Sequence, residues 1–242
     1  MTKILRQLLI IPEIRWFYGK LRFYYFTKLL GKLRTTESND AIDNTIKHNL
    51  KSLSNFGGWR MSKLIKPISI LENISMDARI LVIGPRNEDD ILNLIGHGFS
   101  SRNIIGLDLI SYSPWIQVGD MHNMKFGESY FDVIICGWTL SYSNQPDKFA
   151  KELVRVIKSN GTIAIGVEYS TLTETQAIAV HGGYDLKPNA FERINSTGQI
   201  LDLFKGFVKD IFFNHDAPNR ISHTDKIAKN VSSVVVVFSI KK

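Results

Sequence analysis

Short apolar runs alternate with amphipathic segments between residues 79 and 167. The apolar runs have the length of strands and cover 79–83, 103–108, 115–118, 131–136 and 161–167. Residues 88–98 and 146–158 carry apolar side chains at helical spacing, and Phe149, Leu153 and Val156 fall on one face of the second segment. This alternation of strands and helices predicts an α/β fold with a doubly wound, mostly parallel sheet.

The C-terminal part has a different pattern. Two apolar runs, 207–213 and 231–238, are joined by a polar connection that contains Pro218 and no convincing crossover helix. Because parallel strands need a long crossover, we predict an antiparallel pair. Upstream, residues 38–73 predict one or two helices, with a break at the Phe-Gly-Gly-Trp sequence of 56–59. We therefore divide the chain into a helical N-terminal extension and cap, 1–75, and an α/β domain, 76–242.

Composition is that of an ordinary globular protein, with 44% hydrophobic and 22% charged residues. The single cysteine, Cys136, cannot form an intramolecular disulfide, and its apolar surroundings predict a buried thiol rather than a nucleophile. The sequence holds no cluster of cysteines and histidines, so no metal site is predicted. These features indicate a reduced, cytoplasmic protein.

Positive charge is concentrated in residues 1–34, which hold eight Lys and Arg residues and one acid, a sum of 8 − 1 = +7. The whole chain also carries +7, so the remainder sums to zero and a nucleic-acid-binding face is not expected. Aromatic residues such as Trp16, Tyr18 and Tyr24 lie among these cations, and the apolar runs are too short to span a bilayer. Two hypotheses stay open. The segment lies on an anionic membrane surface at the cytoplasmic face, or its aromatics pack on the domain or on a second subunit of a homodimer.

Polar and acidic residues follow the ends of the predicted parallel strands. The first strand runs into Gly-Pro-Arg-Asn-Glu at 84–88, the second ends at Asp108, the third at Asp120, and the fourth at Gly-Trp, 137–138. Open α/β sheets bind ligands at this edge. A carboxylate after the second strand suits a ribose diol, and one after the third suits an adenine amino group. The layout predicts a nucleoside-binding site.

Two segments, 119–134 and 145–161, resemble class I S-adenosylmethionine-dependent methyltransferases of the type 11 kind. The first contains GDMHNMKF and then YFDVI, and the second reads QPDKFAKELVRVIKSNG. The family has a short polar loop, a strand of this kind and a helix of the E-x-x-R-V-L-K type before its fifth strand, and its sheet ends in an antiparallel pair. The resemblance covers roughly the last two thirds of the chain. It implies a Rossmann-like sheet and an enzyme that uses S-adenosyl-L-methionine as its cofactor.

The first glycine-rich loop departs from the family pattern. The family has an acidic residue two positions before the first glycine and two further glycines, and here those three positions are Val82, Arg86 and Glu88. Only Gly84 is kept. The resemblance then implies that Arg86 pairs with the cofactor's carboxylate and that Glu88 or Asp89 holds its ammonium group. The eroded loop also leaves open an alternative, a non-catalytic binding or scaffold protein with a methyltransferase fold.

The predicted cofactor-binding residues lie in the four turns that follow the strands. They are Gly84, Pro85, Arg86, Glu88, Asp108, Leu109, Asp120, Met121, His122 and Trp138. Asp108 is expected to accept both ribose hydroxyls, and Asp120 the adenine amino group while Met121 packs on the ring. His122 lines the adenine pocket or is a polar loop residue, and a role as catalytic base is the least favoured. Trp138 lies where cofactor and acceptor meet, or is a packing residue.

The methyl acceptor is predicted to be a hydroxyl of a glycan, as in a cell-surface polysaccharide or its precursor, or of a related small molecule. Aromatic and hydroxyl side chains in 138–143 suit a sugar or phenol ring, and the Asn-Pro-Pro-Tyr motif of amino-methylating enzymes is absent after the fourth strand. Lipid, quinone and phenolic acceptors are the alternatives. Removal of the acceptor proton needs a base, for which the candidates are His181 and Glu168.

Overall fold

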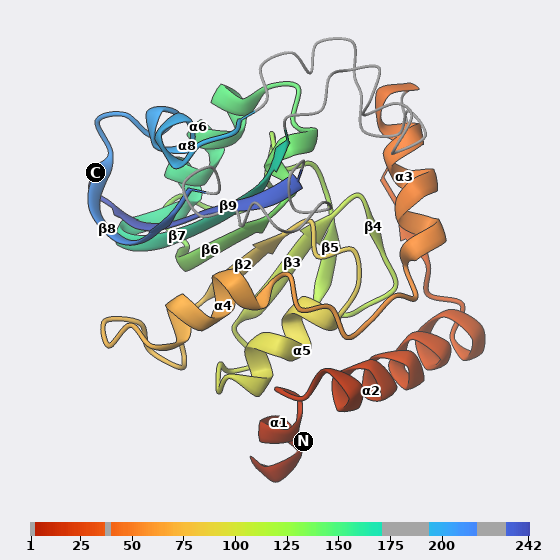
Figure 1. Ribbon diagram of the computed structural model, residues 1–242. Coiled ribbons are helices and arrows are strands. Elements are labelled where there is room, and N and C mark those ends of the chain that lie inside the picture. The colour runs from red at the N-terminus through yellow and green to blue at the C-terminus, as the bar shows by residue number, and fades with distance from the viewer. Residues whose placement is uncertain (1–2, 37–39, 171–193, 217–230) are drawn as a thin grey trace.

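The computed structural model describes residues 3–36, 40–170, 194–216 and 231–242, which fold around a seven-stranded sheet (Figure 1). Its spatial order is β5-β3-β2-β6-β7-β9-β8. The strands are β2 (Ile80–Ile83), β3 (Ile104–Asp108), β5 (Ile116–Val118), β6 (Phe131–Gly137), β7 (Ile157–Ser170), β8 (Val208–His215) and β9 (Val231–Ile240). The first five are parallel, and β9 lies antiparallel between β7 and β8. The predicted parallel core and the predicted antiparallel pair are confirmed.

Helices cover both faces of this sheet. The helices α4 (Ser62–Ser69) and α5 (Asp89–Gly96) lie on one face, and α6 (Pro146–Val156) and α8 (Thr197–Asp202) on the other. Side chains alternate across a strand, so Leu81 of β2 packs in one core cluster with the α6 residue Leu153, while Ile80 packs in the other with the α4 residue Leu64. A strand that is apolar at every position is thus explained by burial on two sides. The doubly wound arrangement is confirmed.

One predicted strand begins earlier than expected. The sequence predicts a fifth strand over 161–167, and β7 starts at Ile157, which pairs with Phe131 of β6. The register then shifts, so that Val133 pairs with Thr162. Cys136 in β6 is fully buried, and this burial raises the pKa of its thiol to about 12. The prediction of a buried rather than reactive cysteine is confirmed.

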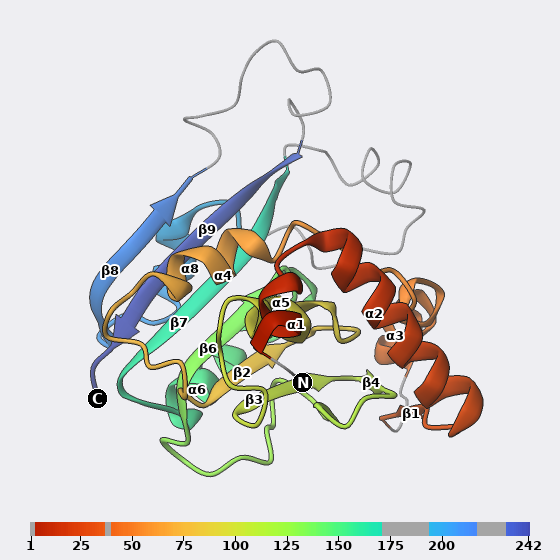
Figure 2. The ribbon, with the colours of Figure 1, turned by 90° about the horizontal axis from the view of Figure 1, so that it is seen from below.

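The N-terminal region packs beside α5 (Figure 2). It contains α1 (Lys3–Leu8), α2 (Pro12–Tyr24), a π-helical continuation η1 (Tyr25–Leu29), and α3 (Asp40–Ser52), which precedes the expected break at 56–59. The strand β1 (Arg34–Thr35) pairs antiparallel with β4 (Ile110–Ser111), a ladder that the sequence analysis did not predict. Leu9 is fully buried in the core cluster that holds α4 and α5. A Cβ on Gly96 would lie 2.7 Å from the backbone N of Ile10, so this glycine allows the N-terminal chain to approach α5 closely.

Candidate functional site

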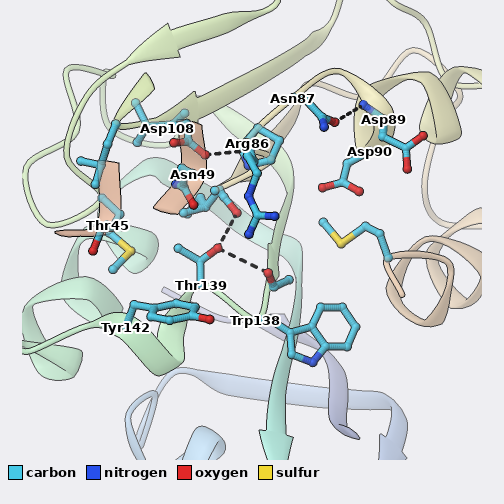
Figure 3. A pocket seen from close by; sticks show the side chains of 18 of the residues that line it. Thr45, Asn49, Arg86, Asn87, Asp89, Asp90, Asp108, Trp138, Thr139 and Tyr142 are labelled. Carbon is cyan, nitrogen blue, oxygen red and sulfur yellow. Dashed lines mark hydrogen bonds between the residues drawn. The ribbon is translucent and has the colours of Figure 1, made fainter. Parts of the chain in front are cut away.

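A cavity of about 450 Å³ lies at the carboxyl ends of the parallel strands (Figure 3). Nine of the ten predicted cofactor-binding residues line it, namely Gly84, Pro85, Arg86, Asp108, Leu109, Asp120, Met121, His122 and Trp138. They come from the turns after β2, β3, β5 and β6. Thr45 and Asn49 of α3, together with Arg60 and Met61 before α4, form another part of the wall. The fold therefore brings the predicted residues to one place.

The turn after β2 has two left-handed residues. Gly84 has φ +68°, and a Cβ at that position would overlap the side chain of Thr139. Arg86 has φ +54°, although it is not a glycine, at a position where the methyltransferase pattern has one. A non-glycine residue in this conformation stores about 1–3 kcal/mol of strain. The turn thus keeps the shape of a glycine loop while adding a guanidinium to the cavity.

Asp108 at the end of β3 is only 5% exposed and holds this turn in place. Its Oδ2 accepts the Arg86 N–H at 2.8 Å, and its Oδ1 accepts the Ile110 N–H at 3.3 Å. Burial raises the pKa of Asp108, and the backbone N–H groups act in the opposite direction. Each carboxylate oxygen has two lone pairs, so acceptor capacity remains for a ligand in the cavity.

Asp120, His122 and Ser143 form a hydrogen-bonded chain between two loops. Asp120 Oδ1 accepts the His122 N–H at 2.9 Å and lies 2.8 Å from His122 Nδ1. His122 Nε2 lies 2.7 Å from Ser143 Oγ, just after the 3₁₀ helix η2 (Leu140–Tyr142). With the Nδ1–H tautomer, Nε2 accepts the Ser143 hydroxyl. Both ring nitrogens are engaged, which favours His122 as a residue that shapes the pocket over His122 as a base.

Glu88, in contrast, does not line the cavity. Its carboxylate is fully buried, with Arg22 Nε at 2.6 Å from Oε2 and Arg22 Nη2 at 2.9 Å from Oε1. The Ser113 hydroxyl donates to Oε1 at 2.6 Å, and the guanidinium of Arg22 stacks on the Trp115 ring at 4.1 Å. A buried carboxylate needs such partners. The expectation that Glu88 contacts the cofactor is therefore corrected, because Glu88 anchors α2.

Asp89 is engaged by α2 in the same way. Arg15, which is 1% exposed, donates from Nε to Asp89 Oδ1 at 2.8 Å. The backbone N–H groups of Gly57 and Gly58 donate to the two carboxylate oxygens at 3.0 and 2.9 Å. Arg15 also donates to the carbonyls of Leu9 and Gly58. Asp89 forms part of the cavity wall, but three donors, the Arg15 Nε and the backbone N–H groups of Gly57 and Gly58, already bind its oxygens.

The sequence analysis missed two charged residues of the cavity, Arg60 and Asp90. The Arg60 guanidinium stacks on Trp138 at 4.2 Å and forms an ion pair with Glu168. Asp90 is half-buried, and burial together with the neighbouring Asp89 raises the pKa of Asp90 to about 8. Neither residue falls in a motif. Arg60 lies between the break at 56–59 and α4, where no motif marks it. Asp90 lies in the first turn of α5, where an acid is ordinarily explained by the helix dipole.

Of the two candidate bases, the structure describes Glu168 but not His181. Glu168 lies in β7, where it is bound by Arg60 and does not itself line the cavity. His181 lies outside the residues that the structure describes. Neither position adds a free base to the described wall of the cavity.

Comparison with known proteins agrees with the geometry. Residues 100–165 match the family model of a methyltransferase domain, a stretch that contains both Asp108 and Asp120. Together with the order of the seven-stranded sheet, this match indicates an S-adenosylmethionine-dependent methyltransferase with the class I fold. No curated protein matches this methyltransferase in sequence.

Three solved structures are similar to this methyltransferase in fold. The MccD protein has a TM-score of 0.54 and 10% identity, over 76% of this chain and 98% of that one. The second is a phosphoethanolamine N-methyltransferase 2 of Haemonchus contortus, in complex with phosphomonomethylethanolamine and S-adenosylhomocysteine. Its TM-score is 0.57 and its sequence identity 14%, over 84% of this chain and 60% of that one. The [4+2]-cyclase SpnF has a TM-score of 0.53 and 13% sequence identity, over 86% of this chain and 98% of that one. The methyltransferase fold is therefore shared at low sequence identity.

S-adenosylmethionine is the cofactor of this methyltransferase, and the residues of the cavity fit it. The buried carboxylate of Asp108 faces the cavity with acceptor capacity left, as a ribose requires. Asp120 and Met121 lie after the next strand, at the place expected for the adenine. The left-handed turn at Gly84 is retained. The positions that lack glycine carry one side chain into the cavity, Arg86, and one away from it, Glu88.

Proposed function

We propose that this methyltransferase transfers a methyl group to a hydroxyl of a glycan, such as a cell-surface polysaccharide or its precursor, or of a related small molecule. The observation that supports an acceptor of this kind is the wall of the cavity beyond Asp108 and Asp120. That wall has aromatic, hydroxyl and amide side chains, from Trp138, Thr139, Tyr142, Asn144 and Gln145. Rings and hydrogen-bonding groups of this kind suit a sugar.

The cofactor supplies an electrophilic methyl group. The chain has to hold the acceptor oxygen in line with that group and to take up the proton that the hydroxyl loses. Trp138 is 6% exposed, and the Arg60 guanidinium stacks on its ring. This packing holds the indole in one position, so its edge in the cavity wall can orient a ring of the acceptor. For the proton we retain His181 and Glu168 as proposed acceptors. In the latter case the carboxylate would exchange its ion pair with Arg60 for the substrate proton.

A methyl-label screen tests the acceptor class. Purified protein with labelled cofactor is offered nucleotide sugars and oligosaccharides, phenols and quinone precursors, lipids, and amines including phosphoethanolamine. We expect label in a glycan product, with the methyl carbon bonded to oxygen by NMR and mass spectrometry. Glu168→Gln, measured against wild type, is expected to lower turnover without changing cofactor affinity if Glu168 takes the proton. Label found only on nitrogen would refute the assignment to oxygen.

We further propose that the N-terminal helices bind an anionic membrane surface. Their outer face, defined here by Ile4, Leu8, Trp16, Phe17, Leu21 and Tyr24, is exposed in the described structure. Phe17 is 66% exposed and Leu21 58%. Arg15 and Arg22 point inward to Asp89 and Glu88, so six cations and one acid remain in 1–34, a sum of 6 − 1 = +5. Each basic residue near an anionic surface contributes about 1 kcal/mol.

No helix in the described ranges is long and apolar enough to cross a bilayer, so the proposal is for surface contact. We expect the full chain to sediment with anionic vesicles at low salt and to be released at high salt, because salt screens charge. Phe17→Ser with Leu21→Ser should abolish this binding. Ile70→Ser with Ile211→Ser, two exposed apolar residues elsewhere, is the matched control. Removing the helices is less informative, since Leu9 and Arg15 are part of the folded core.

A different pattern would contradict the membrane proposal. If wild type ignores anionic vesicles, and Phe17→Ser with Leu21→Ser converts a dimer into a monomer, the outer face is a contact between subunits. Sedimentation equilibrium of both proteins without lipid distinguishes these outcomes.

A further inference from the structure

Three consecutive acids, Glu88, Asp89 and Asp90, lie at the start of α5, and within the described residues one of them, Asp90, has no hydrogen-bond or ion-pair partner. Glu88 is bound by Arg22 and Ser113, and Asp89 by Arg15 and two backbone N–H groups. The Asp90 carboxylate accepts no hydrogen bond and forms no ion pair within the described part of the chain, and it lines the cavity. Figure 3 shows Asp89 pointing away while Asp90 extends toward the side where the Arg86 guanidinium lies.

Arg86 is the second charged residue of this loop that faces the cavity. Its Nε is buried and has no hydrogen-bond partner among the described residues. Arg86 and Asp90 both face the cavity, close enough for Arg86 to lower the pKa of Asp90, yet they form no ion pair with one another. Opposite charges that converge on one space without meeting leave room for a group that carries both charges.

We propose that Asp90 and Arg86 form a two-ended clamp for the α-amino-acid group of the cofactor, with Asp90 binding its ammonium and Arg86 its carboxylate. The inference rests on S-adenosylmethionine being the cofactor. Arg86 and Glu88 replace the glycines that would let the backbone approach this group, so side chains take over its recognition. A guanidinium matches a carboxylate with two parallel hydrogen bonds. Asp90 replaces Glu88 and Asp89, which the sequence analysis considered for the ammonium.

Binding by this clamp depends on pH through the Asp90 carboxyl. The groups that act on Asp90 are Asp89, which raises its pKa, and Arg15, Arg86 and Arg60, which lower it. With the pKa of Asp90 at about 8, the carboxyl of the free protein is mostly protonated at neutral pH. An ammonium group favours the ionised form, so binding releases a proton. Affinity should rise as the pH approaches about 8, where Asp90 ionises, and fall again at higher pH once the ligand's own ammonium group loses its proton.

Calorimetry with two ligands tests the clamp. S-adenosylhomocysteine carries the amino-acid group, and 5′-methylthioadenosine lacks it. We expect Asp90→Asn and Arg86→Gly each to reduce the affinity for S-adenosylhomocysteine by about 10-fold or more. The affinity for methylthioadenosine should stay within about 2-fold of the wild-type value. Arg86→Gly also restores the residue that the left-handed backbone prefers, which protects the fold. Proton release, from titrations in two buffers of different ionisation enthalpy, should disappear in Asp90→Asn.

Asp120→Asn is the matched control. Both ligands contain adenine, so loss of the proposed Asp120 contact to the adenine amino group should reduce the affinity for both. Equal losses for both ligands in Asp90→Asn, or an unchanged S-adenosylhomocysteine affinity in a folded variant, would overturn the clamp. A wild-type protein that binds methylthioadenosine but not S-adenosylhomocysteine would overturn it as well. If wild type binds neither ligand, the cofactor assignment itself fails.

Discussion

Replacing Arg15 by leucine is expected to destabilise the protein by about 3–5 kcal/mol, because it leaves the buried carboxylate of Asp89 without its cation. Arg15 is 1% exposed and also donates to the carbonyls of Leu9 and Gly58, which would lose those hydrogen bonds. Urea denaturation followed by circular dichroism measures the free energy of unfolding. Lys20→Leu on the same helix, whose ammonium lies over the Trp16 ring, is the matched control and should change stability by about 0.5 kcal/mol or less.

A double variant separates the two causes of this loss. Adding Asp89→Asn to Arg15→Leu removes the unpaired charge while keeping an amide that can accept from the backbone of Gly57. We expect part of the stability to return. If Arg15→Leu is as stable as Lys20→Leu, then α2 is not held by this ion pair, and the account of the N-terminal region is wrong.

Asp108→Ala is expected to reduce the affinity for S-adenosylhomocysteine by about 10-fold or more, the loss that follows from one or two buried hydrogen bonds to a charged acceptor. Asp108 also holds the turn after β2 through the Arg86 N–H, so the variant should loosen that turn. Methylthioadenosine contains the same ribose and should be weakened to a similar extent, unlike in Asp90→Asn. An unchanged dissociation constant for a folded Asp108→Ala protein would remove the proposed ribose contact.

The strands and the cavity could be predicted because their signals are local. Apolar runs such as 80–83 mark buried parallel strands, and parallel strands bring their carboxyl ends to one edge, so Asp108 and Asp120 had to lie near one another. The antiparallel C-terminal pair followed in the same way from the lack of a crossover helix. Nothing beyond periodicity and turn chemistry was needed for these elements.

The charge pairs of α2 could not be predicted, because each joins residues far apart in the sequence. Arg15 pairs with Asp89, 74 positions away, and Arg22 with Glu88, 66 positions away. The sequence shows the arginines as part of a basic segment and Glu88 as part of a cofactor loop. In the folded protein the arginines of the basic segment and the acids of the cofactor loop bind one another. The same pairs explain why Asp90, the third acid, is left for the cavity.

These contacts give the eroded glycine loop a physical explanation. Glu88 occupies a position where the family has glycine, and its side chain turns away from the cavity to bind Arg22. Arg86 keeps the left-handed backbone and turns into the cavity. The loop has therefore exchanged backbone flexibility for an attachment to α2 and for charged side chains, while Asp108 still fixes its conformation.

The central claim is that the cavity binds S-adenosylmethionine, and calorimetric titration of the unaltered full chain with S-adenosylhomocysteine tests it most directly. The account predicts saturable binding of one ligand per chain, with no binding of a nicotinamide dinucleotide under the same conditions. A folded protein that binds no adenosyl ligand, or that binds only the dinucleotide, would contradict it.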